Sequence, residues 1–228
     1  MKLNYYMPTH PLLPIESEFA IMTSAERSLL YSAIQQLANS SIIVEVGSAL
    51  GGTACLMASA NPTITVNCVE RFLHGDIGGL WNTGRESMPV RLKQWVQSHH
   101  MKYSDNYLDL ISSIDACLLV DPSGRLAFDA ITKNYPNIKV HAGKSPGDFL
   151  NWTQPVDMYL EDATHINPVL NENIKFWSNH IKPGGFIVGH DYKNLSFPDV
   201  VSEFNKLIIS GWDLIAKVDS LIILQKPC

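Results

Sequence analysis

Short apolar runs alternate with helical patterns along this chain, and that alternation limits the fold more than any other feature of the sequence. The first run is Ile42-Ile43-Val44-Glu45-Val46, which is rich in β-branched residues and stops at Gly47. Runs of similar character cover 63–69, 137–141, 157–161 and 186–189. Continuous apolar runs of this length are typical of strands buried on both faces of a sheet. Strands that alternate with helices predict a doubly wound parallel sheet with right-handed crossovers.

Helical patterns fill the intervals between the apolar runs. Thr23 and Glu26 have the spacing of a capping box, so we expect the first helix over 24–39. Further helices are expected from the glycine turn to residue 60 and over 88–102, 105–119, 124–134, 168–181 and 198–210. The last two apolar runs, 213–218 and 220–225, are so close that they must form a hairpin. The sequence therefore predicts an α/β fold with a doubly wound, mostly parallel seven-stranded sheet and an antiparallel C-terminal strand, in one domain over 1–228.

The composition is that of one soluble domain with a sizeable core, since 46% of the 228 residues are hydrophobic. No apolar run approaches the roughly 20 residues that a membrane helix needs, and the N-terminus lacks the pattern of a secretory signal. The four cysteines are scattered without a CxxC pair, which argues against a zinc site and a disulfide framework and favours a cytoplasmic location. A net charge of −5 without a Lys/Arg cluster disfavours nucleic acid as a partner.

The turn after the first predicted strand contains Gly47, Gly51 and Gly52. Glycine lets the backbone turn sharply and lets a ligand approach the main chain closely. The spacing is GxxxGG and not the GxGxxG of dinucleotide-binding folds, so the turn alone is weak evidence. Glu70 ends the second strand, where a carboxylate can accept both ribose hydroxyls of an adenosine ligand or can simply be a solvated charge. Together these features favour a nucleoside, whose adenine the turn at 143–145 would flank.

Two aspartates follow consecutive predicted strands, Asp162 after one and Asp191 after the next. If the strands are neighbours, their ends lie about 5 Å apart, and two such carboxylates repel each other unless a cation or a proton intervenes. His190 precedes Asp191, and His165 follows Asp162 by three residues. Two carboxylates and an imidazole suit Mg²⁺ or Mn²⁺, and the lack of thiolates fits a hard cation. The alternative is that the aspartates cap helices and His190 is an ordinary buried histidine.

Two stretches resemble a known family. The stretch from Glu45 to Thr53, Glu-Val-Gly-Ser-Ala-Leu-Gly-Gly-Thr, resembles the first motif of class I S-adenosylmethionine-dependent methyltransferases. The stretch 157–191 resembles the metal-dependent group that includes the macrolide sugar O-methyltransferases and cephalosporin-hydroxylase-like proteins. Its shared features are an Asp-x-x-His motif, a helix with a Trp, a Pro-Gly-Gly turn and a His-Asp pair. Here these features are Asp162 to His165, Trp177, Pro183-Gly184-Gly185 and His190-Asp191.

The resemblance implies a Rossmann-like methyltransferase fold and a set of ligand-binding residues. Metal ligation is implied for Asp162, His190 and Asp191. The residues assigned to S-adenosylmethionine, including those that flank the adenine, are Glu45, Gly47, Ser48, Gly51, Glu70, Gly143, Ser145 and Asp162. The chain departs from the group at Asn173, where an acidic residue is common, and at Glu161-Asp162-Ala163, which replaces the usual Asp-Gly turn.

We therefore expect an enzyme that methylates a hydroxyl of a small-molecule acceptor, such as a sugar or a polyphenol. A sulfonium methyl needs little activation, so the protein has mainly to align the acceptor and lower the pKa of its hydroxyl. His165 is the expected general base because an imidazole titrates near neutral pH and lies next to the predicted metal. Two alternatives remain open, a donor-binding protein without turnover and a hydroxylase-type oxidoreductase.

The segment 71–123 does not match the family pattern. Its glycines and the side chains of Trp81, Trp95 and Tyr103 suit a lid over a ring-shaped acceptor or a homodimer contact. A plain helical insertion that packs on the core explains the same composition.

Overall fold

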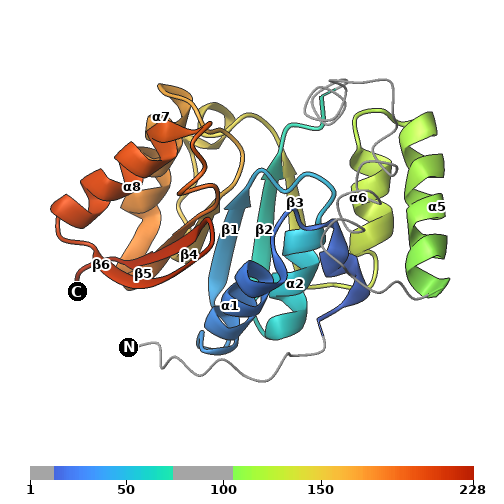
Figure 1. Cartoon of the computed structure of the whole chain (residues 1–228), viewed down its shortest axis with the longest axis horizontal. Coiled ribbons are helices and arrows are strands. Elements are labelled where there is room, and N and C mark those ends of the chain that lie inside the picture. Colours follow the sequence, from blue (N-terminus) through green and yellow to red (C-terminus); the bar gives the residue numbers. More distant parts are fainter. Residues whose placement is uncertain (1–12, 74–104) are drawn as a thin grey trace.

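The computed structural model describes residues 13–73 and 105–228, which form one seven-stranded α/β sheet with helices on both faces (Figure 1). The strand order is β3-β2-β1-β4-β5-β7-β6. The strands are β1 (Ile42–Val46), β2 (Thr65–Glu70), β3 (Ile138–Ala142), β4 (Val156–Glu161), β5 (Ile181–Gly189), β6 (Asp213–Val218) and β7 (Leu221–Gln225). The first five strands are parallel, and β7 runs antiparallel between β5 and β6. The chain reverses its direction of travel across the sheet between β1 and β4, so a switch point lies there.

The helices connect the strands as the alternation predicts. The α-helices are α1 (Ser24–Gln35), α2 (Gly52–Ala60), α5 (Asp105–Val120), α6 (Arg125–Thr132), α7 (Val169–His180) and α8 (Pro198–Ile209). Two 3₁₀ turns, η1 (Ile15–Phe19) and η2 (Gly147–Phe149), complete the described elements. Figure 1 shows α1 and α2 over one face of the sheet and α5 as the outermost helix, beyond α6. Within residues 13–73 and 105–228, no helix has the length and apolar character needed to cross a membrane.

Two apolar layers hold the sheet, because alternate residues of each strand face opposite sides. On one side, Ile43 of β1 and Met158 of β4 pack with Leu30 of α1 and Met57 of α2. On the other side, residues such as Val44, Tyr159 and Ile187 pack against Trp177 of α7 and Phe204 of α8. A third cluster joins α5 and α6 to α2 and η1. A cleft opens at the carboxyl ends of the parallel strands, and the candidate site lies there.

Helix α1 begins with the expected capping box. The Thr23 hydroxyl accepts a hydrogen bond from Glu26 N, and the Glu26 carboxylate accepts one from Thr23 N. Glu26 also accepts hydrogen bonds from the backbone N and the hydroxyl of Ser220, in the turn between β6 and β7. The capping residue therefore ties the first helix to the C-terminal hairpin as well as starting the helix.

The fold confirms the sequence prediction in its main features. The seven strands and the C-terminal hairpin are present, and α5 and α6 occupy the predicted ranges 105–119 and 124–134. Helix α1 is shorter than expected, because it ends at Gln35 and not at residue 39. Strand β5 starts at Ile181, before the Pro-Gly-Gly turn that was expected to precede it. The predicted helix 88–102, together with Trp81, Trp95 and Tyr103, lies outside the described residues.

Candidate active site

A cleft of about 400 Å³ opens at the carboxyl ends of the strands. The turns that follow β1, β2, β3 and β4 border it, with the first turns of α7. The sequence-predicted residues that line it are Gly47, Glu70, Gly143, Ser145 and Asp162. Glu45, Ser48 and Gly51 were predicted to bind the same ligand but are not among the lining residues. The position matches the ligand crevice of doubly wound sheets.

Gly47 is required by two features of the turn after β1. Its φ is +93°, in the left-handed region that favours glycine. A Cβ at this position would lie 2.5 Å from the Cα of Ala163 and 2.5 Å from the carbonyl oxygen of Asp162. The sequence predicts a glycine here because a ligand approaches the main chain closely. The structure shows that it also lets the turns after β1 and β4 touch, which places Asp162 beside the cleft.

Glu70 holds the glycine turn from the end of β2. One carboxylate oxygen accepts a hydrogen bond of 2.9 Å from Ala49 N, and the other accepts one of 2.8 Å from Arg71 N. Each carboxylate oxygen has a second lone pair, so both can still accept a hydroxyl of a ligand. Glu70 lines the cleft and therefore faces the place where a ribose would lie.

Glu45, at the end of β1, and Ser48, within the glycine turn, are both buried and do not line the cleft. Glu45 is fully buried, and the Cys68 thiol donates to one of its carboxylate oxygens at 3.5 Å. Burial raises the pKa of Glu45 to about 8. At neutral pH the side chain is therefore mainly protonated, which makes it part of the support for the turn.

The buried Glu45 makes the stability of the protein depend on pH. The folded state keeps a proton with a pKa of about 8, whereas the ordinary pKa is 4.5, so stability is full below pH 4.5 and falls as the pH rises through 8. Glu45→Gln cannot ionise, and we expect it to raise the free energy of unfolding at pH 8 by on the order of 2 to 4 kcal/mol. Urea unfolding of both proteins at pH 5 and pH 8 measures this difference. A difference that is the same at both pH values would contradict the assignment.

Gly51 has a structural role at the start of α2. Its φ is +86°, and a Cβ would lie 2.7 Å from Thr132 and 3.0 Å from Phe128, both on α6. The turn after β3 is held to α7, because the Trp177 indole N–H donates to the Ser145 hydroxyl at 2.9 Å. Ser145 and Gly143 thus border the cleft on the side of β3.

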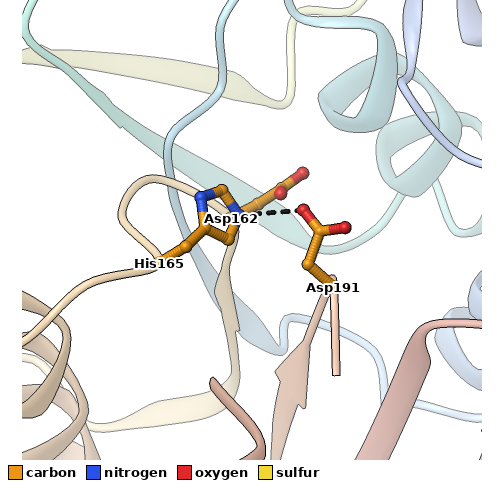
Figure 2. A group of neighbouring side chains, drawn as sticks. All are labelled: Asp162, His165 and Asp191. Carbon is orange, nitrogen blue, oxygen red and sulfur yellow. Dashed lines mark ion pairs between the residues drawn. The ribbon is translucent and has the colours of Figure 1, made fainter. Parts of the chain in front are cut away.

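A group of three potential metal ligands adjoins the cleft at Asp162. One ligand atom each from Asp162, His165 and Asp191 lies within 4.8 Å of the other two, and Figure 2 shows these side chains directed toward one another. His165 Nε2 lies 3.0 Å from Asp191 Oδ2. This nitrogen is buried and has no well-aligned hydrogen bond within the described part of the chain. Two carboxylate oxygens and an imidazole nitrogen at this spacing fit a divalent cation such as Mg²⁺ or Mn²⁺.

Neighbouring side chains fix the orientation of Asp191 and His165. Asp191 has a φ of +61°, which turns its side chain toward His165 at the end of β5. The Asn194 amide donates to Asp191 Oδ1 at 3.0 Å, and the ring of Phe197 stacks on His165 with centroids 4.2 Å apart. Burial would raise the pKa of Asp191, but its close contact with His165 and its hydrogen bond from Asn194 outweigh burial and lower it.

The comparisons agree with this geometry. Residues 44–192 match the family model described as a methyltransferase domain. The chain belongs to this methyltransferase family. The matched range contains the glycine turn, Glu70, Asp162, His165 and Asp191. The protein is thus an S-adenosylmethionine-dependent methyltransferase of class I, as the resemblance predicted, and no curated protein sequence matches it.

Solved structures share the fold of this methyltransferase at low sequence identity. A candidate caffeoyl-CoA O-methyltransferase from Staphylococcus aureus superposes with a TM-score of 0.52 at 17% identity, over 94% of this chain and 86% of that one. The O-methyltransferase NovP gives a TM-score of 0.51 at 13% identity, over 89% of this chain and 79% of that one. The precorrin-6y C5,15-methyltransferase of Geobacter metallireducens gives 0.50 at 13% identity, over 92% of both chains. At this identity the likeness shows the fold alone.

Both predicted histidines lie beside the two aspartates, and the roles predicted for them stay predictions. His190, predicted as a metal ligand, is buried, and both of its ring nitrogens face carboxylates: Nδ1 lies 3.1 Å from Asp162 Oδ1, and Nε2 lies 3.5 Å from Glu26 Oε2. Burial would lower its pKa, but Asp162, Glu26 and Asp191 raise it to about 11. His165, predicted as the general base, lies within the group of three potential ligands.

Sequence reasoning missed several residues that shape the methyltransferase site. Glu161 is buried below Asp162, accepts a hydrogen bond from the Tyr159 hydroxyl, and accepts further bonds from Ala163 N and Thr164 N. It therefore fixes the turn that carries Asp162. Glu26 was recognised only as a helix cap, and no sequence signal links it to His190. Asn173, which departs from the family pattern, lines the cleft.

Proposed function

We propose that this methyltransferase transfers the methyl group of S-adenosylmethionine to a hydroxyl of a small-molecule acceptor, with a divalent cation held by Asp162, His165 and Asp191. One observation supports the proposal above the others. Asp162 belongs both to the lining of the cleft and to the group of three ligands. A donor in the cleft and a cation at this group would therefore be neighbours. Two structures of the same fold are described as O-methyltransferases, which is consistent with this proposal.

The residues of the cleft fit the donor. The two Glu70 oxygens, each with a lone pair still available, suit the two ribose hydroxyls. The strand order sets β3 and β4 three strand spacings apart, about 14 Å, which is the length of an extended nucleoside joined to an amino acid. With the ribose at Glu70, the sulfonium end would lie toward Asp162 and the purine toward the turn at 143–145.

The residues of the metal group fit their proposed role. Methyl transfer breaks the carbon–sulfur bond, forms a carbon–oxygen bond and leaves a thioether, while the acceptor hydroxyl gives up its proton to solvent water or hydroxide. A bound divalent cation would supply Lewis acidity that lowers the pKa of that hydroxyl. His190 contacts one carboxylate oxygen of Asp162, and the Asn194 amide donates a hydrogen bond to one carboxylate oxygen of Asp191. These contacts orient the two carboxylates. The spacing of the three side chains supports His165 as the third ligand. With Nε2 bound to the cation, the same nitrogen could not also accept the proton of the acceptor.

The expectations about domain extent, cellular location and the segment 71–123 remain proposals. These are a single domain over 1–228, a cytoplasmic location, and a lid or homodimer contact formed by 71–123, most of which lies outside the described residues. Donor binding without methyl transfer to any acceptor would favour the alternative of a binding protein. Oxygen dependence would favour the oxidoreductase alternative.

Glu70→Ala tests the donor part of the proposal. We expect the affinity for S-adenosylhomocysteine to fall about 10- to 100-fold, because two hydrogen bonds to a charged acceptor are lost. Isothermal titration calorimetry measures this change. Glu172→Ala, the same change at an exposed position on α7, is the matched control and should bind like the native protein. Unchanged binding by Glu70→Ala would mean that the ribose does not lie at Glu70.

A further inference from the structure

Asn173 on α7 is a buried polar side chain with an unused hydrogen-bonding atom. The residue is 1% exposed, and its carboxamide oxygen has no hydrogen-bond partner among the described residues. The residue also lines the cleft. A buried polar atom without a partner costs about 1 to 3 kcal/mol, which a protein tolerates at a site where a ligand completes the bond. The donor proposal does not use this residue.

The position of Asn173 along the cleft follows from its neighbours. Trp177 lies four residues later on the same face of α7, and its indole N–H donates to Ser145 in the turn after β3. Gly143 N in that turn donates to the carbonyl oxygen of Glu70. Asn173 therefore faces the part of the cleft next to β3 and Glu70. The three metal-ligand candidates lie beyond Gly47, at the ends of β4 and β5.

We propose that the Asn173 carboxamide binds the adenine of the donor through the 6-amino group and an adjacent ring nitrogen. This inference rests on the proposed function, which places the ribose at Glu70 and the sulfonium toward Asp162. The purine then occupies the stretch between Ser145 and α7. Adenine presents an amino donor beside a ring-nitrogen acceptor, and a carboxamide is the side chain that matches both at once. A carboxylate at this position could accept from the amino group but could not donate to the ring nitrogen.

The geometry also sets the sign of a stability effect. In the ligand-free protein the unpaired oxygen of Asn173 lowers the free energy of unfolding. An apolar side chain of similar size should therefore make the ligand-free variant at least as stable as the native protein. The same change should weaken donor binding. A residue with only a structural role would show the opposite, a loss of stability with intact binding of the donor.

The experiment uses the full chain and three binding probes measured by calorimetry. The probes are S-adenosylhomocysteine, 5′-methylthioadenosine, which lacks the amino-acid end, and the S-adenosylhomocysteine analogue without the 6-amino group. For Asn173→Leu we expect affinity for the first two probes to fall by a similar factor, roughly 10- to 50-fold. Affinity for the analogue should fall by a smaller factor, about 3- to 5-fold, because with the analogue the native protein makes only the bond to the ring nitrogen. The melting temperature of the ligand-free variant should be unchanged or higher.

Controls separate this inference from the proposed function. Asn179→Leu places the same substitution at an exposed position of α7 and should bind all three probes like the native protein. If Asn173→Leu does not fold, Asn173→Ala removes the same carboxamide and is measured in its place. No binding of S-adenosylhomocysteine by the native protein would overturn the proposed function and this inference with it. Native binding with undiminished affinity in the Asn173 variants would overturn this inference alone. Loss of S-adenosylhomocysteine affinity with full 5′-methylthioadenosine affinity would place Asn173 at the amino-acid end and also overturn it.

Discussion

Asp162→Asn and Asp191→Asn are each expected to lower the rate of methyl transfer by about 1000-fold or more and to abolish the stabilisation of the protein by Mg²⁺ or Mn²⁺. Both changes keep the size of the side chain and remove the charge that a hard cation requires. Metal titration monitored by melting temperature measures the second effect without an acceptor. Binding of S-adenosylhomocysteine should be largely retained, because only the edge of the cleft is altered.

Asp213→Asn, an exposed position on β6, is the matched control and should keep both the metal response and the activity. A full metal response in both the Asp162 and the Asp191 variant would contradict a cation at this group.

The simple repulsion between two carboxylates that the sequence suggested does not apply in the structure. Asp162 lies 3.1 Å from His190, and Asp191 lies 3.0 Å from His165. Removing either charge therefore also removes an ion pair, and the ligand-free variants should not be more stable than the native protein.

Gly47→Val is expected to reduce the free energy of unfolding by about 3 to 5 kcal/mol. A side chain at a φ of +93° costs about 1 to 2 kcal/mol, and the contact at 2.5 Å with the Asp162–Ala163 backbone adds the cost of overpacking. Urea denaturation measures the loss. Gly147→Val is a matched control, because its Cβ would have no neighbour within 4 Å, and it should change stability by less than about 1 kcal/mol.

The result for Gly47→Val decides between two explanations of the glycine turn. In the structure Gly47 allows the turns after β1 and β4 to touch. Gly47→Val should therefore lose donor binding together with stability. Native-like stability with donor binding alone abolished would show that the sequence-based explanation, close approach by the ligand, was sufficient.

The parts of the site that follow from backbone topology were predictable from the sequence. The ends of strands could be located by their apolar runs, and parallel strands bring their carboxyl ends to one edge of the sheet. This reasoning brought Gly47, Glu70, Asp162 and Asp191 to one edge, where the structure has them. Their roles in binding stay predictions.

The parts that depend on side-chain direction were not predictable from one sequence. Asp191 adopts a φ of +61°, so the alternation of an extended strand does not tell which way it and His190 point. His190 faces Glu26 at the place where α1 meets the hairpin of β6 and β7. This meeting depends on long-range contacts, such as the hydrogen bond between Ser220 and Glu26, which are 194 positions apart in the sequence. Asn173 shares its α7 face with Trp177, and only the placement of α7 over the turn after β3 shows that this face reaches the cleft.

The most direct test of the account is a crystal structure of the native protein grown with S-adenosylhomocysteine and Mn²⁺, with anomalous diffraction data. The account predicts a nucleoside in the cleft with its ribose at Glu70. It also predicts an anomalous peak within about 2.3 Å of ligand atoms of Asp162, His165 and Asp191. A nucleoside bound elsewhere, or a Mn²⁺ peak that is absent from these three side chains, would contradict it.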